Sequence, residues 1–105
     1  MNQFDVYINP SPSTHAALPF IVDIQSPVIS ELATRIVIPL GRMTYFKNEQ
    51  LQGLTPVIEY QDERLLLLTA QIASVPKKIL KKPVGSLADC RAEIISAVDF
   101  AITGF

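Results

Sequence analysis

The chain has 105 residues, of which 49% are apolar and 18% charged, so it is long enough for one folded domain and is not a disordered chain. Its formal net charge of −1 argues against general binding to a nucleic-acid backbone, which requires clustered Lys and Arg. The single cysteine cannot form an internal disulfide, and no signal peptide or membrane-length apolar run is visible. We therefore expect a cytoplasmic protein made of one domain, residues 1–105.

Two segments of alternating polarity open the chain and are separated by a loop rich in proline. Every second residue of each segment is apolar, which is typical of a strand with one face in the core; these residues are Phe4, Val6 and Ile8 in the first segment and Phe20, Val22 and Ile24 in the second. Asp23 and Gln25 point to the other face of the second strand. Because three prolines exclude a central strand from residues 10–19, we predict a hairpin with a long loop.

The next predicted strand is the segment at residues 35–40, in which every second residue is apolar. Pro39 lacks an N–H group and should end the ladder of this strand on one side. Residues 27–34 before it are predicted to form a loop or a single helical turn, and a loop with a short turn follows it. Arg35 and Arg42 flank the strand, where we favour ordinary surface charges over an anion site.

A second hairpin is predicted in residues 55–72. Its two strands are joined by a polar turn of three residues, 61–63. The leucine run at residues 65–68 has no alternation, so both faces of that strand should be covered. One more short strand is predicted around Ile79.

The clearest helix begins near Ser86, a favourable N-cap residue, with Asp89 as a weak capping box. At about 100° per residue, one arc of this helix is apolar; the arc comprises Leu87, Cys90, Ile94, Ala97, Val98, Ala101 and Phe105, flanked by Ile95 and Ile102. Phe100 lies outside it. Short strands followed by one terminal helix predict a mainly β fold, a small SH3-like barrel or twisted antiparallel sheet with the C-terminal α-helix packed on it.

Side chains with catalytic or metal-binding chemistry are sparse. His15 is the only histidine and lies far in sequence from Cys90, which is expected to be a structural thiol on the apolar arc. One cysteine and one histidine cannot make a zinc site, and the four glycines are too scattered for a phosphate-binding loop. Asp62 and Glu63 are better explained by a solvated turn than by acid–base chemistry. We therefore expect a binding protein without a cofactor, and not an enzyme.

Small residues recur at the end of the predicted helix. Ala97, Ala101 and Gly104 lie at i, i+4 and i+7, and such a stripe lets another backbone approach closely. The stripe either packs on the sheet of its own chain or meets the same stripe of a second copy across a two-fold axis. Phe100 and Ile102 then remain as apolar groups near the chain end, which favours a partner-binding surface.

Several motifs of the chain occur in the same order and spacing in a known family of toxins. They are QFDVYIN, FIVDIQSPVIS, TRIVIPL, ASVPKKIL and EIISAVDFAITGF, and together they extend over essentially the whole chain. The chain therefore resembles CcdB, the toxin of a bacterial type II toxin–antitoxin module. The resemblance implies a homodimer built on an SH3-like barrel with a C-terminal helix, and no enzymatic activity.

The same resemblance implies two protein partners. CcdB proteins bind the A subunit of DNA gyrase and trap the enzyme in its covalent, DNA-cleaved state. A partner antitoxin, CcdA, folds a disordered C-terminal segment onto the toxin and removes it from gyrase. On plasmids, such a pair kills daughter cells that lose the plasmid. Direct binding to nucleic acid or to a membrane is not expected.

Carried over motif by motif, the gyrase contacts of the family fall on two segments of this sequence. They are the end of the helix and the residues just after the VDIQS strand, namely Asp99, Ile102, Thr103, Gly104 and Phe105 together with Val28 and Ile29. Thr103 stands where well-known members have a tryptophan that stacks on a gyrase arginine, and Asp99 replaces an asparagine. A threonine has no aromatic face for such a cation–π contact, which contributes about 0.5–2 kcal/mol.

Two other interpretations stay open at this point. One is a chromosomal homologue that binds an antitoxin but poisons gyrase weakly or not at all, and Thr103 is the residue that keeps it open. The other is an endoribonuclease of the MazF type, whose fold is similar to that of CcdB. The lack of a convincing basic and acid–base cluster speaks against a ribonuclease.

Overall fold

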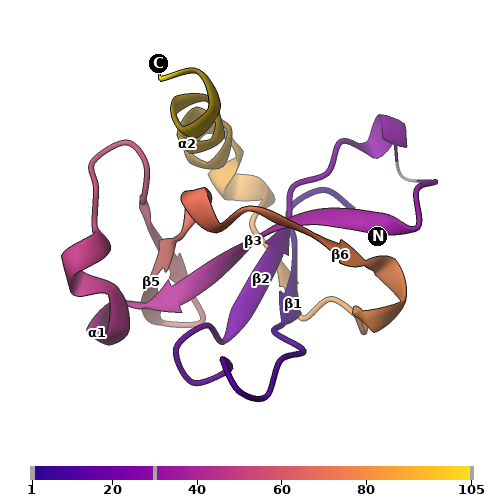
Figure 1. Ribbon diagram of the computed structural model, residues 1–105, viewed down its shortest axis with the longest axis horizontal. Coiled ribbons are helices and arrows are strands. Elements are labelled where there is room, and N and C mark those ends of the chain that lie inside the picture. The colour runs from indigo at the N-terminus through magenta and orange to yellow at the C-terminus, as the bar shows by residue number, and fades with distance from the viewer. Residues whose placement is uncertain (1, 30, 105) are drawn as a thin grey trace.

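The computed structural model describes residues 2–29 and 31–104, which form a curled antiparallel sheet with a helix packed on it (Figure 1). The strands are hydrogen-bonded in the order β4–β5–β3–β2–β1–β7, and β6 pairs with a further stretch of β3. Their bounds are Asp5–Ile8 for β1, Phe20–Asp23 for β2, Thr34–Arg42 for β3, Val57–Tyr60 for β4, Glu63–Leu67 for β5, Ala73–Pro76 for β6 and Gly85–Ser86 for β7. The mainly β fold with a C-terminal helix is thereby confirmed.

Short helical segments connect the strands. The α-helices span Met43–Phe46 (α1) and Arg91–Thr103 (α2). The three-ten turns span Pro27–Ile29 (η1), Lys47–Glu49 (η2), Thr69–Gln71 (η3), Lys77–Ile79 (η4) and Ala88–Cys90 (η5). The helical turn expected within residues 27–34 is present as η1. The strand expected around Ile79 is wrong. The pairing of β6 with β3 runs out at Thr34↔Pro76, so Ile79 has passed the end of β3 and has no strand left to pair with.

β3 is the longest strand because it pairs along both of its edges. One edge pairs with β2, and the other pairs first with β6, as far as Val37, and then with β5, from Leu40 onward. Pro39 lies in the gap between these two pairings, where a missing N–H group costs no ladder bond. Its carbonyl accepts a bond of 3.0 Å from the N–H of Leu68 in this gap. The ladder is therefore interrupted on one side only, but it does not end at Pro39 as predicted, because β5 continues the pairing from Leu40 onward.

β4 and β5 form the second hairpin, in which Tyr60 pairs with Glu63. The turn between them has two residues, Gln61 and Asp62, and the expectation of three was wrong because Glu63 already belongs to β5. Both turn residues have positive φ, 52° and 62°, which is typical of the type I′ turn that matches the twist of a hairpin. The leucine run at residues 65–68 is buried throughout, as predicted.

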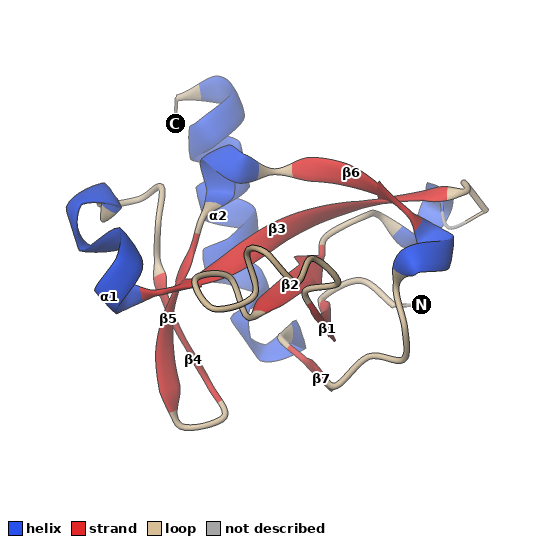
Figure 2. Cartoon of the chain, turned by 60° about the horizontal axis from the view of Figure 1, so that its bottom comes forward, coloured by secondary structure: helices blue, strands red, loops and turns tan. Residues whose placement is uncertain are grey.

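The sheet curls until its two end strands, β4 and β7, approach each other (Figure 2). Tyr60 of β4 packs edge-on against Phe20 of β2, with ring centroids 5.1 Å apart. The ring and hydroxyl of Tyr60 lie directly over Gly85 of β7, where an added Cβ atom would overlap them. The glycine therefore permits a close approach that closes the sheet into a half-barrel.

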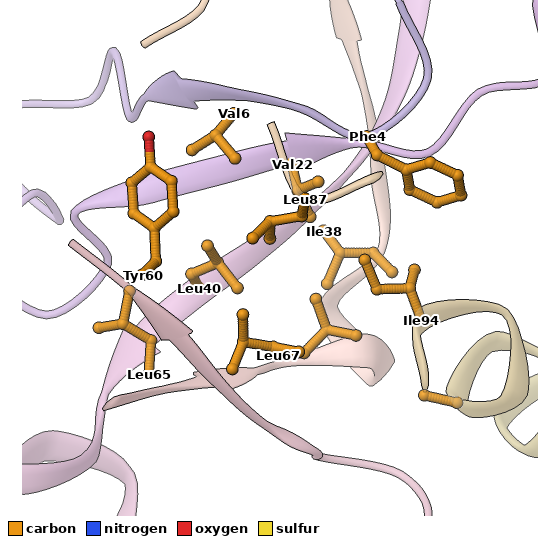
Figure 3. Packing of buried hydrophobic residues seen from close by; sticks show 12 residues of the cluster. Phe4, Val6, Val22, Ile38, Leu40, Tyr60, Leu65, Leu67, Leu87 and Ile94 are labelled. Carbon is orange, nitrogen blue, oxygen red and sulfur yellow. The ribbon is translucent and has the colours of Figure 1, made fainter. Parts of the chain in front are cut away.

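The inner face of the half-barrel holds the main apolar cluster, into which Ile94 points from α2 (Figure 3). Its buried members are Phe4, Val6, Val22, Ile38, Leu40, Ile58, Tyr60, Leu65, Leu67, Leu87, Ile94 and Ala97. A second, smaller cluster covers the other face of the same strands and comprises Tyr7, Ile21, Val37 and Leu80. The central strands are therefore buried on both faces.

This double coverage buries two charges that the sequence placed at the surface. Nε of Arg35 donates to Oδ2 of Asp23 at 2.8 Å, and Nη2 lies 2.7 Å from the same oxygen. The two side chains are 1% and 0% exposed. The expectation of a surface charge at Arg35 is wrong, because the face opposite the main cluster is covered as well. Arg42, in contrast, forms a half-exposed pair with Glu63 at 3.0 Å.

α2 begins later than predicted. Ser86 belongs to β7 and is not the N-cap of the helix, although its Oγ atom accepts a bond of 3.1 Å from the N–H of Ala88, the first residue of η5. Asp89 lies within that turn, and α2 itself begins at Arg91.

Candidate partner-binding surface

The second half of α2 has no core beneath it. Ile94 and Ala97 are buried, and Ile95 and Val98 are half-buried, whereas all of residues 99–104 are exposed. Figure 1 shows this end of the helix rising clear of the sheet. Phe100 retains 42% of its surface and Ile102 retains 72%. The helix therefore docks by its first half and presents apolar side chains with its second half.

Hydrogen bonds within the last turn of α2 satisfy carbonyl groups at the C-terminal end of the helix. Gly104 has a φ of 80°, and its N–H donates to the carbonyl of Phe100 at 2.9 Å. This left-handed conformation at a helix end suits glycine. The hydroxyl of Thr103 donates to the carbonyl of Asp99 at 2.6 Å, so it is engaged by the helix itself. The predicted contact residue Phe105 lies outside the described residues.

A shallow groove of about 340 Å³ runs between the end of α2 and the turn η3. Its lining is mostly apolar and comprises Leu54, Thr69, Ala70, Ile72, Phe100, Ala101 and Ile102. The ring of Phe100 lies beside the backbone of Gly53, which covers part of it. The exposed apolar end of α2 thus continues into a groove rather than standing alone.

The second predicted contact segment is also exposed. Val28 and Ile29 lie in η1 and retain 88% and 41% of their surface. The Oγ atom of Ser26 accepts from the N–H of Val28 at 3.2 Å, and the carbonyl of Ser26 accepts from the N–H of Ile29 at 3.1 Å. These bonds close the turn and leave both apolar side chains at the surface.

The two contact segments do not form one continuous patch within a single chain. In Figure 1 the end of α2 (yellow) and the connection that contains η1 (purple) both rise above the sheet but stand well apart. The molecule extends 36 Å along its longest axis. A partner that touches both segments must therefore span the distance between them or meet segments from two copies of the chain.

The predicted stripe of small residues is divided by the fold. Ala97 is fully buried in the core of its own chain, so its assignment to a dimer interface is corrected. Because residues 99–104 are exposed, Ala101 and Gly104 are the two residues of the stripe that lie at the surface of the chain.

Cys90 and His15, the two residues considered for nucleophilic chemistry, lie in different surroundings. Burial raises the pKa of the Cys90 thiol, and the carboxylates of Glu93 and Asp89 raise it further, which is the opposite of what a nucleophile needs. His15 lies instead at a hollow with Lys81 and Lys82. Within residues 2–29 and 31–104, no group of three His, Cys, Asp or Glu side chains could hold a metal ion.

Gln25 is the functional candidate that the sequence missed. Its side chain is 1% exposed, its Nε2 donates to the carbonyl of Ile29 at 2.7 Å, and its Oε1 accepts from the N–H of Ile36 at 3.0 Å. A glutamine that follows a strand at a position alternating with apolar residues looks solvent-facing. The signal that could have revealed its burial is the apolar character of Tyr7, Ile21 and Val37 on that same face.

The structure thus combines a half-barrel with a helix that is docked by its first half and has an exposed apolar end. The family model for CcdB protein matches residues 3–104 of the chain. The chain therefore belongs to the CcdB family, a family of toxins of toxin–antitoxin systems. Among the described residues, no helix has the length and apolar character needed to cross a membrane.

Proposed function

We propose that this protein binds the A subunit of DNA gyrase and traps the gyrase–DNA cleavage complex, and that a CcdA-like antitoxin neutralises it. The observation that carries the proposal is the second half of α2, where all of residues 99–104 are exposed and where Ile102 and Phe100 retain 72% and 42% of their surface. On this proposal the protein acts in the cytoplasm, by binding and without catalysis.

The exposed apolar side chains have the size that a binding hot spot needs. Full burial of a Val, Ile or Phe side chain contributes about 1.5–3 kcal/mol. Ile102, Phe100 and Val28 are each exposed enough to gain a large part of this on contact with a partner. The helix end and η1 are therefore the segments on which gyrase affinity should depend most.

A homodimer would resolve the separation of the two contact segments. Two copies related by a two-fold axis present two helix ends and two η1 turns. Ala101 and Gly104, exposed at the end of α2, allow the close approach of a second helix. The dimer interface is therefore proposed to include Ala101 and Gly104.

Thr103 favours a second candidate, a homologue that binds its antitoxin but poisons gyrase weakly. The side chain provides no aromatic face, and its hydroxyl is already bonded to the carbonyl of Asp99. Loss of one cation–π contact of about 0.5–2 kcal/mol weakens binding by up to about thirtyfold. Asp99 adds a negative charge to the same surface.

The test is a gyrase supercoiling and cleavage assay with the purified protein and with Thr103→Trp. Accumulation of cleaved DNA with the natural sequence is the expected result. Cleavage with Thr103→Trp alone would indicate an intact scaffold that has lost its aromatic anchor. No cleavage with either protein would contradict the proposal, and cleavage of RNA by the purified protein would support a ribonuclease instead.

A further inference from the structure

The connection from β2 to β3 carries Val28 and Ile29 but has no apolar anchor of its own. Its described residues 26–29 and 31–34 are all exposed. The bonds from Ser26 close the turn η1 locally but do not attach it to the sheet. Some other group must therefore fix the position of η1 relative to the sheet.

The side chain of Gln25 makes this attachment. Its Nε2 donates to the carbonyl of Ile29 at 2.7 Å while its Oε1 accepts from the N–H of Ile36 in β3 at 3.0 Å. One buried amide thus bridges the end of the turn and the neighbouring strand. The amide is shielded from water, so water does not readily take its place. Loss of its N–H donor would therefore remove this hydrogen bond from the carbonyl of Ile29.

Gln25 is itself held by the buried ion pair. Oδ1 of Asp23 accepts from the N–H of Gln25 at 2.9 Å, and Oδ2 of Asp23 is paired with Arg35. Nη1 of Arg35 has no hydrogen-bond partner among the described residues. A buried ion pair with an unsatisfied donor is a poor source of stability compared with apolar residues of similar size. Its clearest structural consequence is the fixed orientation of Asp23 behind Gln25.

We propose that Gln25 is a positioning residue for partner binding. Supported by Asp23 and Arg35, it holds η1 in the shape that presents Val28 and Ile29 to the gyrase A subunit. The inference rests on the proposed function of that surface. Gln25 is buried and acts through the turn, not by touching the partner.

The test compares two amide-to-acid substitutions. Gln25→Glu keeps the size and the acceptor of the side chain but removes the donor to Ile29. Asn9→Asp is the matched control, because the buried Asn9 likewise donates from its amide to a loop carbonyl, that of Leu18, at 2.8 Å, in the loop between β1 and β2. Calorimetric titration with purified gyrase A subunit should show about tenfold weaker binding for Gln25→Glu and a change below about twofold for Asn9→Asp.

A second readout needs no gyrase. The N–H of Leu32 donates to the carbonyl of Ile29 at 3.3 Å, so amide hydrogen exchange at Ile29 and Leu32 reports on the turn. We expect exchange at these amides to rise about tenfold in Gln25→Glu, the factor that corresponds to losing one hydrogen bond, and to stay unchanged in Asn9→Asp. Gln25→Met removes the donor to Ile29 and also the acceptor for the N–H of Ile36, without adding charge, and replaces Gln25→Glu if that variant does not fold.

The outcomes separate this inference from the proposed function. If the unaltered protein does not bind the gyrase A subunit, the proposed function is wrong, and the exchange rates still decide whether Gln25 holds the turn. Equal losses of affinity in the Gln25 and Asn9 variants, or unchanged exchange at Ile29 and Leu32, would overturn the positioning role.

Discussion

Gly85 is the residue at which the two end strands of the sheet approach each other. The Tyr60 ring occupies the space that a side chain at position 85 would need. Gly85→Ala should therefore lower the free energy of unfolding by about 1–3 kcal/mol, because overpacking forces the ring or β7 to move. Urea denaturation measures this change.

A double variant provides the control for Gly85→Ala. The hydroxyl of Tyr60 is buried without a hydrogen-bond partner among the described residues, and it is the atom nearest to the added Cβ position. Tyr60→Phe alone should therefore change the free energy of unfolding little. The double variant Tyr60→Phe/Gly85→Ala should be more stable than Gly85→Ala alone. If Gly85→Ala is as stable as the unaltered chain, the account of sheet closure is wrong.

Cys90 should make the stability of the protein sensitive to alkaline pH. Burial, followed by the carboxylates of Glu93 and Asp89, raises the pKa of this thiol above its ordinary value of 9.0. Below that value the thiol is protonated in both the folded and the unfolded chain, so it does not change the free energy of unfolding. Above it the unfolded chain loses the proton first, so the free energy of unfolding falls as pH rises. In Cys90→Ala the free energy of unfolding should fall less steeply with pH in this range. Equal slopes of the free energy of unfolding against pH in both proteins would contradict the raised pKa.

The sequence correctly indicated that Phe4, Val6 and Val22 face the main cluster. It was wrong about Ile8, which lies at the end of β1 and is 53% exposed, and it missed the residues on the other face. Alternation places Val6 and Val22 in the core because it assumes that one face is wet. Asp23, Gln25 and Arg35 look like surface residues under that assumption, whereas the second cluster buries all three. Coverage of the second face depends on distant residues such as Leu80, which local periodicity does not contain.

At the scale of single elements, the turn between β4 and β5 is open to improvement. Gln61 and Asp62 both adopt positive φ, which suits Asn-Gly much better. The double substitution Gln61→Asn and Asp62→Gly should raise the free energy of unfolding by about 0.5–2 kcal/mol. Thermal denaturation checks this result, and a loss of stability would contradict the assignment of a two-residue turn.

α2 shows how far periodicity alone can predict a functional element. The apolar arc correctly included Leu87, Ile94 and Ala97, which are all buried. The same arc continued through Ala101, although the core ends before it. The helical pattern contains no information on how far the sheet extends beneath the helix, so the division between the docked and exposed halves required the structure.

At the scale of the whole molecule, the proposed dimer depends on the exposed small residues of α2. Ala101→Glu places a charge where a second copy should approach and should reduce the mass measured by sedimentation equilibrium to that of a monomer. Ala92→Glu is the matched control, since Ala92 is an exposed alanine of the same helix outside the proposed interface. A stable dimer of Ala101→Glu would show that the interface lies elsewhere.

Direct titration of the gyrase A subunit tests whether the exposed half of α2 binds it, as proposed. We would compare the unaltered protein with Ile102→Asp and with Ile8→Asp, the latter because Ile8 is also an exposed isoleucine, 53% accessible, at the end of β1. We expect the unaltered protein and Ile8→Asp to bind alike, whereas Ile102→Asp should bind at least about tenfold more weakly. Equal binding by Ile102→Asp, or no binding by the unaltered protein, would contradict the proposal.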